Sequence, residues 1–218
     1  MCTWVCTCLA WTESKAGTAR VIRRKYRAVG GELEVRIRPM RSLCVFCGSS
    51  AGRDPGYIAL ARETGALLAQ RGITLVYGGG RVGLMGALAD AALGAGGRVV
   101  GVIPQMLLDL EVGHAGLSEL HVVQTLSERK LLMSELADAF LALPGGIGTM
   151  DELFEAWTWV QLSLMAKPCG LLNHAGYYDT LIGFLDHAVR EGFLRPAHRD
   201  ALRVDSDVIR LLDRLATP

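Results

Sequence analysis

From residue 40 onwards, short continuous apolar runs alternate with longer segments in which apolar residues recur at helical spacing. The runs have the length of β-strands, and turn residues bound them. Strands are predicted at residues 43–47, 73–77, 99–103, 121–123, 139–143 and 169–172. Helices are predicted at residues 54–72, 84–93, 125–137, 149–165, 177–191 and 207–215. The irregular pattern of residues 105–120 predicts a loop with short helical pieces.

Strands that are apolar throughout, each followed by a helix, are typical of a parallel sheet covered on both faces. The sequence therefore predicts an α/β domain with three layers, α/β/α, of the Rossmann-like kind with a mostly parallel sheet. Ligands of such domains bind beyond the carboxyl ends of the strands. Glycine-rich turns at residues 48–50, 78–80 and 144–148 all follow strands, so we expect them on that one edge. Three such turns together favour a nucleotide ligand.

The turn at residues 144–148 contains Gly145, Gly146 and Gly148, and a helix follows it. Glycines let a backbone pass close to a ligand where a Cβ would clash, and the free N–H groups at a helix start favour an anion. The alternative is that Thr149 and Glu152 form a capping box, Thr-x-x-Glu, which needs no ligand. Because a capping box does not require the three glycines, we favour an anion-binding turn.

Residues 78–83 match the pattern Gly-x-Gly-x-x-Gly, which is weak evidence alone. A dinucleotide site also needs an acidic residue at the end of the next strand, for the ribose hydroxyls. That strand ends with Gly101-Val102-Ile103-Pro104 and has no carboxylate, which argues against NAD or FAD. The phosphate loop of ordinary NTPases, Gly-x-x-x-x-Gly-Lys-Ser/Thr, is also absent from the sequence.

The totals describe a globular chain of 218 residues with a formal net charge of +1, which gives no case for nucleic-acid binding. No apolar run reaches the ~18 residues of a membrane helix. Residues 1–40 carry eight Lys and Arg against three Asp and Glu, with the apolar part before the basic part. That order is opposite to a secretory signal, while an Arg-rich transit segment stays open. We expect residues 1–40 to be a poorly ordered extension and residues 41–218 to form the domain.

Cys44 and Cys47 have the Cys-x-x-Cys spacing of a redox site or half a zinc site. They lie within a predicted strand, where positions i and i+3 face opposite sides. No second Cys/His pair lies near them in the sequence. We therefore predict buried thiols of a protein in the reducing cytoplasm.

Charged residues also occur in the predicted helix at residues 125–137, which precedes the turn at residues 144–148. Arg129 and Lys130 lie in its first turn, where each cation opposes the helix dipole by about 0.3–1 kcal/mol. A bound anion would offset this cost, although a solvated turn is the plainer interpretation. Glu152 is suited to face positive charge that develops on a sugar when an N-glycosidic bond breaks.

Pro144-Gly145-Gly146-Ile147-Gly148-Thr149-Met150-Asp151-Glu152 resembles the Pro-Gly-Gly-x-Gly-Thr-x-x-Glu motif of the "lonely guy" (LOG) family, the cytokinin riboside 5′-monophosphate phosphoribohydrolases. Further matches follow in the family's order. They are Cys47-Gly48-Ser49-Ser50, Tyr77-Gly78-Gly79-Gly80, Gly83-Leu84-Met85-Gly86, Arg129-Lys130, Thr158-Trp159 and Gly170-Leu171-Leu172-Asn173. The resemblance covers residues 41–195.

The resemblance implies hydrolysis of nucleoside 5′-monophosphates, including AMP, to free base and ribose 5-phosphate. It implies that Arg129 and Glu152 are catalytic. The substrate-binding residues that it implies are Gly79, Gly80, Met85, Lys130, Gly145, Gly146, Gly148, Thr149, Asp151 and Thr158. It further implies a homodimer with no metal and no organic cofactor. The thiols, the net charge and the short apolar runs predict a cytoplasmic protein with neither nucleic acid nor membrane as partner. Such proteins are often labelled lysine decarboxylases, but nothing in the sequence supports a pyridoxal phosphate site.

Two positions depart from the family pattern. Ser127 stands where the family often has His, and Asp151 stands where it usually has Glu. Ser127 can still cap a helix, so we expect altered rather than lost activity, and the shorter Asp151 side chain changes contacts to the base. The competing hypothesis is a non-catalytic carrier of a nucleotide or of the molybdenum cofactor, as in related proteins. A carrier needs the phosphate turns but not Arg129 and Glu152, so that pair argues for the enzyme.

Overall fold

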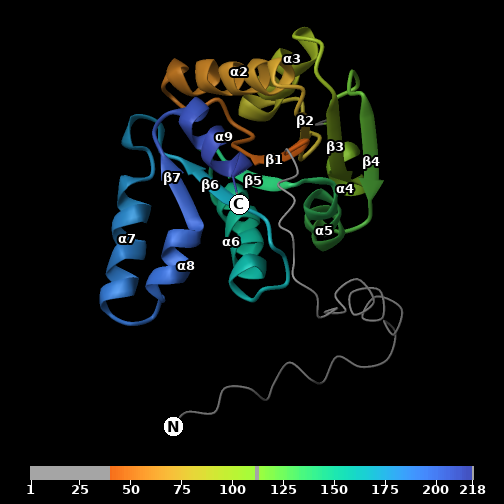
Figure 1. Cartoon of the computed structure of the whole chain (residues 1–218). Helices are drawn as coiled ribbons and strands as arrows, with labels where there is room; N and C mark the ends of the chain where they lie inside the picture. The colour runs from red at the N-terminus through yellow and green to blue at the C-terminus, as the bar shows by residue number, and fades with distance from the viewer. Residues whose placement is uncertain (1–39, 111–112, 218) are drawn as a thin grey trace, which may run out of the picture. The chain divides into compact units, whose positions relative to one another are not determined.

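The computed structural model describes residues 40–110 and 113–217, and within them seven strands form one sheet (Figure 1). The strands are β1 (Ser42–Phe46), β2 (Thr74–Tyr77), β3 (Val99–Pro104), β4 (Glu119–Val123), β5 (Ala139–Ala142), β6 (Cys169–Leu172) and β7 (Leu202–Asp205). Their order across the sheet is β4-β3-β2-β1-β5-β6-β7, and every pairing is parallel. The predicted parallel α/β fold is confirmed. The predicted N-terminal extension, apart from Met40, lies outside the described residues.

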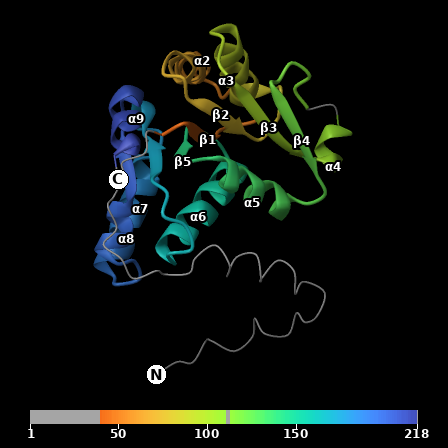
Figure 2. The same cartoon turned by 45° about the vertical axis from the view of Figure 1, so that its right-hand side comes forward.

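Helices cover both faces of the sheet. They are α2 (Pro55–Gln70), α3 (Gly83–Gly94), α4 (Gln105–Leu108), α5 (Leu126–Leu136), α6 (Ile147–Gln161), α7 (Asp179–Arg190), α8 (Pro196–Ala201) and α9 (Val208–Ala216), with a 3-10 turn η1 (His174–Gly176). Helices α2, α3 and α9 lie on one face, and α5, α6, α7 and α8 lie on the other (Figures 1 and 2). Among the described residues, no helix is both long and apolar enough to cross a membrane.

The period of two along each strand divides the core between the two faces. In β1, Leu43 and Val45 pack on the α2 side, while Cys44 and Phe46 pack on the α6 side. Cys47 returns to the α2 side, so the two thiols of the Cys-x-x-Cys pair face opposite ways. Both are buried and free, as the strand pattern predicted.

Side chains cap the starts of two predicted helices, whereas the capping box considered for a third is absent. Asp54 caps α2 through the Gly56 N–H, and Thr125 forms a capping box with Glu128 at the start of α5. The capping box of Thr149 and Glu152, which was the alternative to an anion-binding turn, does not form, because α6 begins at Ile147 with Gly146 as its N-cap. Thr149 lies within the helix and is buried. The helix thus begins two residues earlier than the capping pattern indicated.

Sequence analysis missed β7 and α8. Residues 202–205 mix apolar and charged side chains and form an edge strand, so they lack the continuous apolar run of a central strand. Helix α8 has six residues and contributes no fully buried side chain. Neither element forms part of the glycine-rich edge described below.

The strand order reverses next to β1. The chain proceeds from β1 outwards through β2 and β3 to β4, and α5 then returns it to β5 on the other side of β1. The carboxyl ends of β1 and β5 therefore form a topological switch point, where an open parallel sheet leaves a crevice for a ligand. The turns after β1 and β5 are two of the three predicted glycine-rich turns.

Candidate active site

A pocket of about 230 Å³ lies at this switch point. The turn after β1 (residues 48–52) forms one wall, and Pro144, Gly145 and Gly146 after β5 form the other. Leu84 and the rings of Tyr57 and Tyr177 complete the lining. Two of the three glycine-rich turns, those after β1 and β5, therefore meet across one small cavity, while residues 78–80 are not part of its lining.

Gly145 and Gly146 in the second wall of the pocket lack a side chain for different reasons. A Cβ on Gly145 would lie 2.1 Å from Thr149 Oγ1 and 2.9 Å from the Gly48 nitrogen, so packing alone requires glycine there. A Cβ on Gly146 would meet nothing within 4 Å, and its φ of −96° is open to any residue. Since neither packing nor backbone conformation explains Gly146, we interpret its missing side chain as room for a ligand.

Helix α6 starts at this pocket. Its N-cap is Gly146, and no side chain caps the first turn. The first N–H groups of a helix have no partner within the helix, and the dipole places partial positive charge among them. An anion in the pocket would meet these groups, together with the hydroxyl groups of Ser49 and Ser50 on the opposite wall.

Arg129, in the first turn of α5, extends to the third part of the site. Its Nε donates to the Val102 carbonyl at 3.2 Å, and its Nη2 donates to the Gly78 carbonyl at 3.4 Å. The same Nη2 lies 3.3 Å from Glu152 Oε1. A Cβ on Gly78 would lie 1.8 Å from Nη2, so the glycine-rich turn after β2 makes room for this guanidinium group.

Glu152 lies on α6 with only 11% of its side chain exposed. Burial raises its pKa above the ordinary value, and the charge of Arg129 partly opposes this shift. Gly148 lies one turn earlier on the same helix face, and a Cβ there would meet nothing within 4 Å. The carboxylate therefore has open space beside it, towards the start of the helix.

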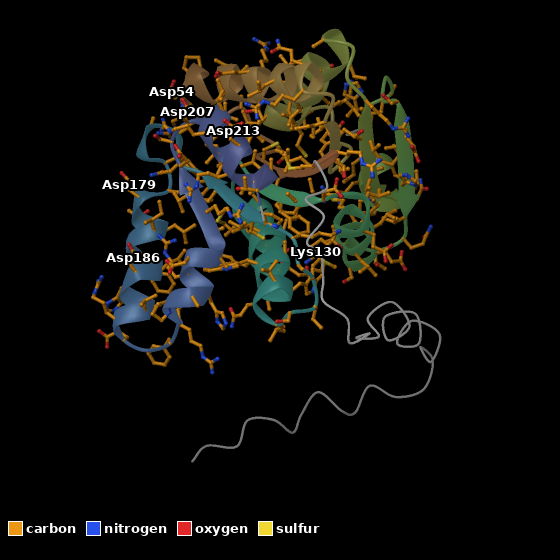
Figure 3. The ribbon with its side chains drawn as sticks, in the orientation of Figure 1. Asp54, Lys130, Asp179, Asp186, Asp207 and Asp213 are labelled. Atoms are coloured by element: carbon orange, nitrogen blue, oxygen red, sulfur yellow. The ribbon has the colours of Figure 1, made fainter. Side chains whose placement is uncertain are left out.

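Lys130 points between α5 and α6 (Figure 3). Its Nζ pairs with Asp151 Oδ2 at 2.9 Å and also with Glu155. Burial alone lowers the pKa of Lys130, but the hydrogen bonds to these two carboxylates raise it above its ordinary value. The structure therefore places Lys130 and Asp151 together, outside the lining of the pocket.

The other predicted substrate-binding residues lie around this centre or away from it. Gly79 has φ of +73°, and its carbonyl accepts from the His114 N–H, while Gly80 bridges to Gly113. Met85 is next to Gly78, within contact distance of a Cβ there. Thr158 is exposed on α6, about 9 Å along the axis from Glu152. The structure does not bring Thr158 together with Glu152.

Sequence analysis did not select Ser49, Ser50 or Tyr177 as site residues, although all three line the pocket. The turn that contains the serines was recognised from its glycine and hydroxyl residues. Tyr177 was predicted to be the first residue of a helix, whereas the structure places it between η1 and α7. Among the described residues, no group of three or more His, Cys, Asp or Glu side chains is placed to hold a metal ion.

The distance between the start of α6 and Glu152 suits a sugar phosphate. Glu152 lies six residues after Gly146 on α6, which is about 9 Å along the helix axis. A sugar phosphate is long enough to bridge this gap, with its anion at the helix start and its ring carbon near the carboxylate. The arrangement can thus bind an anion at one end and stabilise a cationic carbon at the other.

Comparisons with known proteins show the family to which the chain is similar. A family model described as "Possible lysine decarboxylase" matches residues 85–215. A cytokinin riboside 5′-monophosphate phosphoribohydrolase of Rhodococcoides fascians is 49% identical over 179 residues, 82% of this chain and 90% of that protein. A protein of the same name from Arabidopsis thaliana, LOG1, is 48% identical over 159 residues, 73% of this chain and 75% of that protein.

Solved structures with the same fold are more distant. The molybdenum cofactor binding protein of Rippkaea orientalis matches with a TM-score of 0.61 and 19% identity, over 81% of this chain and 97% of that one. The molybdenum cofactor carrier protein of Chlamydomonas reinhardtii matches with a TM-score of 0.57 and 21% identity, over 79% and 94%. At these identities the likeness shows the fold alone.

Proposed function

This chain belongs to the family of cytokinin riboside 5′-monophosphate phosphoribohydrolases, and from that premise we propose how its residues act. The protein is an enzyme that hydrolyses the N-glycosidic bond of nucleoside 5′-monophosphates, AMP included, to free base and ribose 5-phosphate. The observation that carries the proposal is the buried pair of Glu152 and Arg129 beside an uncapped helix start.

The 5′-phosphate binds in the pocket between the turns after β1 and β5. The amides of Gly145 and Gly146 and the first turn of α6 donate to it, and the serine hydroxyls donate from the opposite wall. The ribose then lies over Gly148, where no side chain blocks it. This placement brings the anomeric carbon next to Glu152.

Glu152 acts on the anomeric carbon. As the C–N bond breaks, its electron pair stays on the base and positive charge develops on the sugar, which the carboxylate stabilises. A water oxygen bonds to that carbon, its proton passes to Glu152, and the base takes up a proton from solvent. The raised pKa of Glu152 makes it a stronger base than an exposed carboxylate.

Arg129 favours the ionised form of the Glu152 carboxylate. Its positive charge lowers the pKa of Glu152 and so opposes the effect of burial, which favours the ionised carboxylate. The two backbone carbonyls that accept from the guanidinium fix its position. The remaining N–H groups can donate to the ribose or to the departing base.

A non-catalytic carrier is the weaker alternative. Binding a phosphate needs the pocket and the helix start, but it does not need an ion pair with both side chains nearly nine-tenths buried. Desolvating such a pair costs free energy, which a catalytic role explains and a carrier role does not. The likeness to the molybdenum cofactor proteins concerns the fold and does not alter this conclusion.

The lysine decarboxylase description does not fit the lysines of the described residues. Pyridoxal phosphate chemistry needs a lysine amine that can form a Schiff base, favoured by a lowered pKa. Lys130 is paired with two carboxylates and has a raised pKa, which opposes that role. Lys167 donates to the carbonyls of Ser134 and Ala137.

We also propose that the protein is a cytoplasmic homodimer. Buried free thiols at Cys44, Cys47 and Cys169 are typical of a reducing compartment. Ile147, at the start of α6, has 87% of its surface exposed, and Phe184 on α7 has 62% exposed. A second copy of the chain would cover such apolar side chains, and light scattering of the purified protein tests this.

The activity is tested with a panel of AMP, prenylated AMP, GMP and CMP. We expect free base and ribose 5-phosphate in equal amounts from at least one nucleotide, and the panel identifies the preferred base. Base release from none of the four, by a protein that binds ribose 5-phosphate, would contradict the enzymatic proposal and favour the carrier.

A further inference from the structure

Each backbone carbonyl of the turn after β5 has a specific hydrogen-bond donor. The Leu143 carbonyl accepts from the Tyr178 hydroxyl at 2.7 Å, and the Pro144 carbonyl accepts from the Gly48 N–H at 3.1 Å. The Gly145 carbonyl accepts from the Tyr177 hydroxyl at 2.7 Å. Two adjacent tyrosines thus hold two carbonyls of the wall that faces the anion pocket.

A carbonyl that is held also fixes the amide that follows it. The peptide unit is planar and trans, so the N–H of the next residue points opposite to the C=O. By holding the Gly145 carbonyl, Tyr177 sets the direction of the Gly146 N–H. Tyr178 holds the Leu143 carbonyl, but the nitrogen of that peptide belongs to Pro144 and carries no hydrogen. Tyr178 therefore orients no N–H donor. The two hydroxyls therefore have different consequences for the pocket.

The peptide between Gly145 and Gly146 is the one that most needs such a restraint. Glycines tolerate conformations that other residues avoid, so this peptide is not restricted by side chains of its own two residues. Rotation would turn the carbonyl oxygen towards the pocket and the N–H away from it. The pocket would then present a negative dipole end to a phosphate in place of a donor.

The position of Tyr177 is itself fixed. Its ring packs edge-on against Tyr178, with ring centres 4.7 Å apart, and against Tyr57, with centres 5.5 Å apart. Tyr57 is held next to the turn after β1, since a Cβ on Gly52 would lie 2.7 Å from its ring. The hydroxyl of Tyr177 is thus presented to the Gly145 carbonyl by a rigid group of rings.

We propose that Tyr177 is a positioning residue for phosphate recognition, which holds the Gly145–Gly146 peptide with its N–H directed into the pocket. The inference deepens the proposed function and rests on its placement of the 5′-phosphate. Tyr177 contributes no proton and no charge to the reaction. Its role is to keep a donor of the anion site in place before the substrate arrives.

The test compares Tyr177→Phe with Tyr178→Phe, which remove the same atom from neighbouring residues. Dissociation constants for ribose 5-phosphate and inorganic phosphate are measured by calorimetry, and melting temperatures by thermal unfolding. Tyr177→Phe should weaken both ligands about tenfold, the loss of one charge-assisted donor, with little change in melting temperature because Tyr177 is part-exposed. Tyr178→Phe should lower the melting temperature, since it leaves the buried Leu143 carbonyl unpaired, but should keep the wild-type affinity.

The amide resonance of Gly146 reports the peptide directly. Phosphate should shift it strongly in the wild type and in Tyr178→Phe, and weakly in Tyr177→Phe. If Tyr178→Phe fails to fold, the comparison of the wild type with Tyr177→Phe decides the matter. Equal affinity in that comparison, or equal losses in both variants, would overturn the inference.

This experiment separates the inference from the proposed function. A protein that releases no base from any nucleotide, but shows the predicted tenfold difference in ribose 5-phosphate affinity, would refute the activity and retain the role of Tyr177. A protein that releases base with the same KM for AMP in the wild type and Tyr177→Phe would retain the activity and refute the role.

Discussion

Gly78→Ala tests the position of Arg129 without altering any proposed catalytic residue. The new Cβ would lie 1.8 Å from Arg129 Nη2, whereas non-bonded atoms stay about 3.5 Å apart. The guanidinium group must therefore retreat by roughly 1.5–2 Å to restore that separation. Its interactions with Glu152 and with the Gly78 carbonyl, at 3.3 and 3.4 Å, cannot both survive this movement.

The expected loss of activity is large, while the loss of stability is moderate. Removing one preorganised charge from a transition state typically costs 10²–10³-fold in kcat, about 2.7–4 kcal/mol. The two hydrogen bonds of Arg129 to backbone carbonyls contribute about 0.5–1.5 kcal/mol each to folding. A domain with ~5–15 kcal/mol of stability tolerates that loss, so the variant should fold.

The pH dependence gives the substitution a second readout. Burial raises the pKa of Glu152 and Arg129 lowers it, so moving Arg129 away should raise this pKa further. Activity requires the ionised carboxylate and falls as pH drops through its pKa. In Gly78→Ala, the acid limb of kcat/KM against pH should therefore move to higher pH. The assay is initial-rate release of adenine from AMP across a series of buffers.

Gly183→Ala is the matched control, because it makes the same change at an exposed glycine in α7 with nothing within 4 Å of the new Cβ. It should leave activity unchanged and stabilise the protein by about 0.5–1 kcal/mol, as expected for Ala in a helix interior. If Gly78→Ala keeps the wild-type kcat and the wild-type acid limb, Arg129 does not act on Glu152 as described.

Three further predictions follow from the same geometry. Adenosine should have a kcat/KM at least a hundredfold below that of AMP, because it lacks the anion that the pocket binds; comparable values for the two would reject a phosphate pocket. Gly146→Ala should change the free energy of unfolding, measured in urea, by no more than about 1 kcal/mol. The same substitution should raise the KM for AMP at least tenfold, and an unchanged KM would show that substrate does not use the space beside Gly146. The thiols of Cys44, Cys47 and Cys169 should stay unlabelled by a thiol reagent at pH 8 until the protein unfolds, since burial raises their pKa, to about 12 for Cys169; rapid labelling in peptide mass spectrometry would contradict this.

Much of the fold could be predicted because its signals are local. Five strands are largely apolar runs, and the caps at Asp54 and Thr125 depend on residues within one helical turn. The strand at residues 202–205 was not predicted, because an edge strand needs apolar residues at fewer of its positions. The capping box of Thr149 and Glu152 does not form because α6 begins at Ile147, so that Thr149 lies inside the helix.

The site could be predicted only in part, because its geometry depends on tertiary contacts. Glycines and hydroxyl residues at strand ends indicate an anion site from sequence alone. That Arg129 of α5 meets Glu152 of α6, or that Gly78 makes room for the guanidinium group, depends on how the crossover returns the chain to β5. The hydroxyl of Tyr177 donates to the Gly145 carbonyl across 32 residues of sequence, and only the structure shows that contact.

Glu152→Gln, compared with Glu155→Gln one helical turn along, tests the central claim most directly. The glutamine keeps the shape of Glu152 but can neither accept a proton nor oppose a positive charge. The pKa of Glu152 is raised in the folded protein, so the stability that protonated Glu152 contributes at low pH is lost as pH rises through that pKa. At neutral pH the side chain therefore adds no such stability, and replacing it by Gln should not lower the melting temperature. We expect Glu152→Gln to bind AMP with near wild-type affinity and release no adenine, while Glu155→Gln stays within a few-fold of the wild type. Normal turnover by Glu152→Gln would contradict the account.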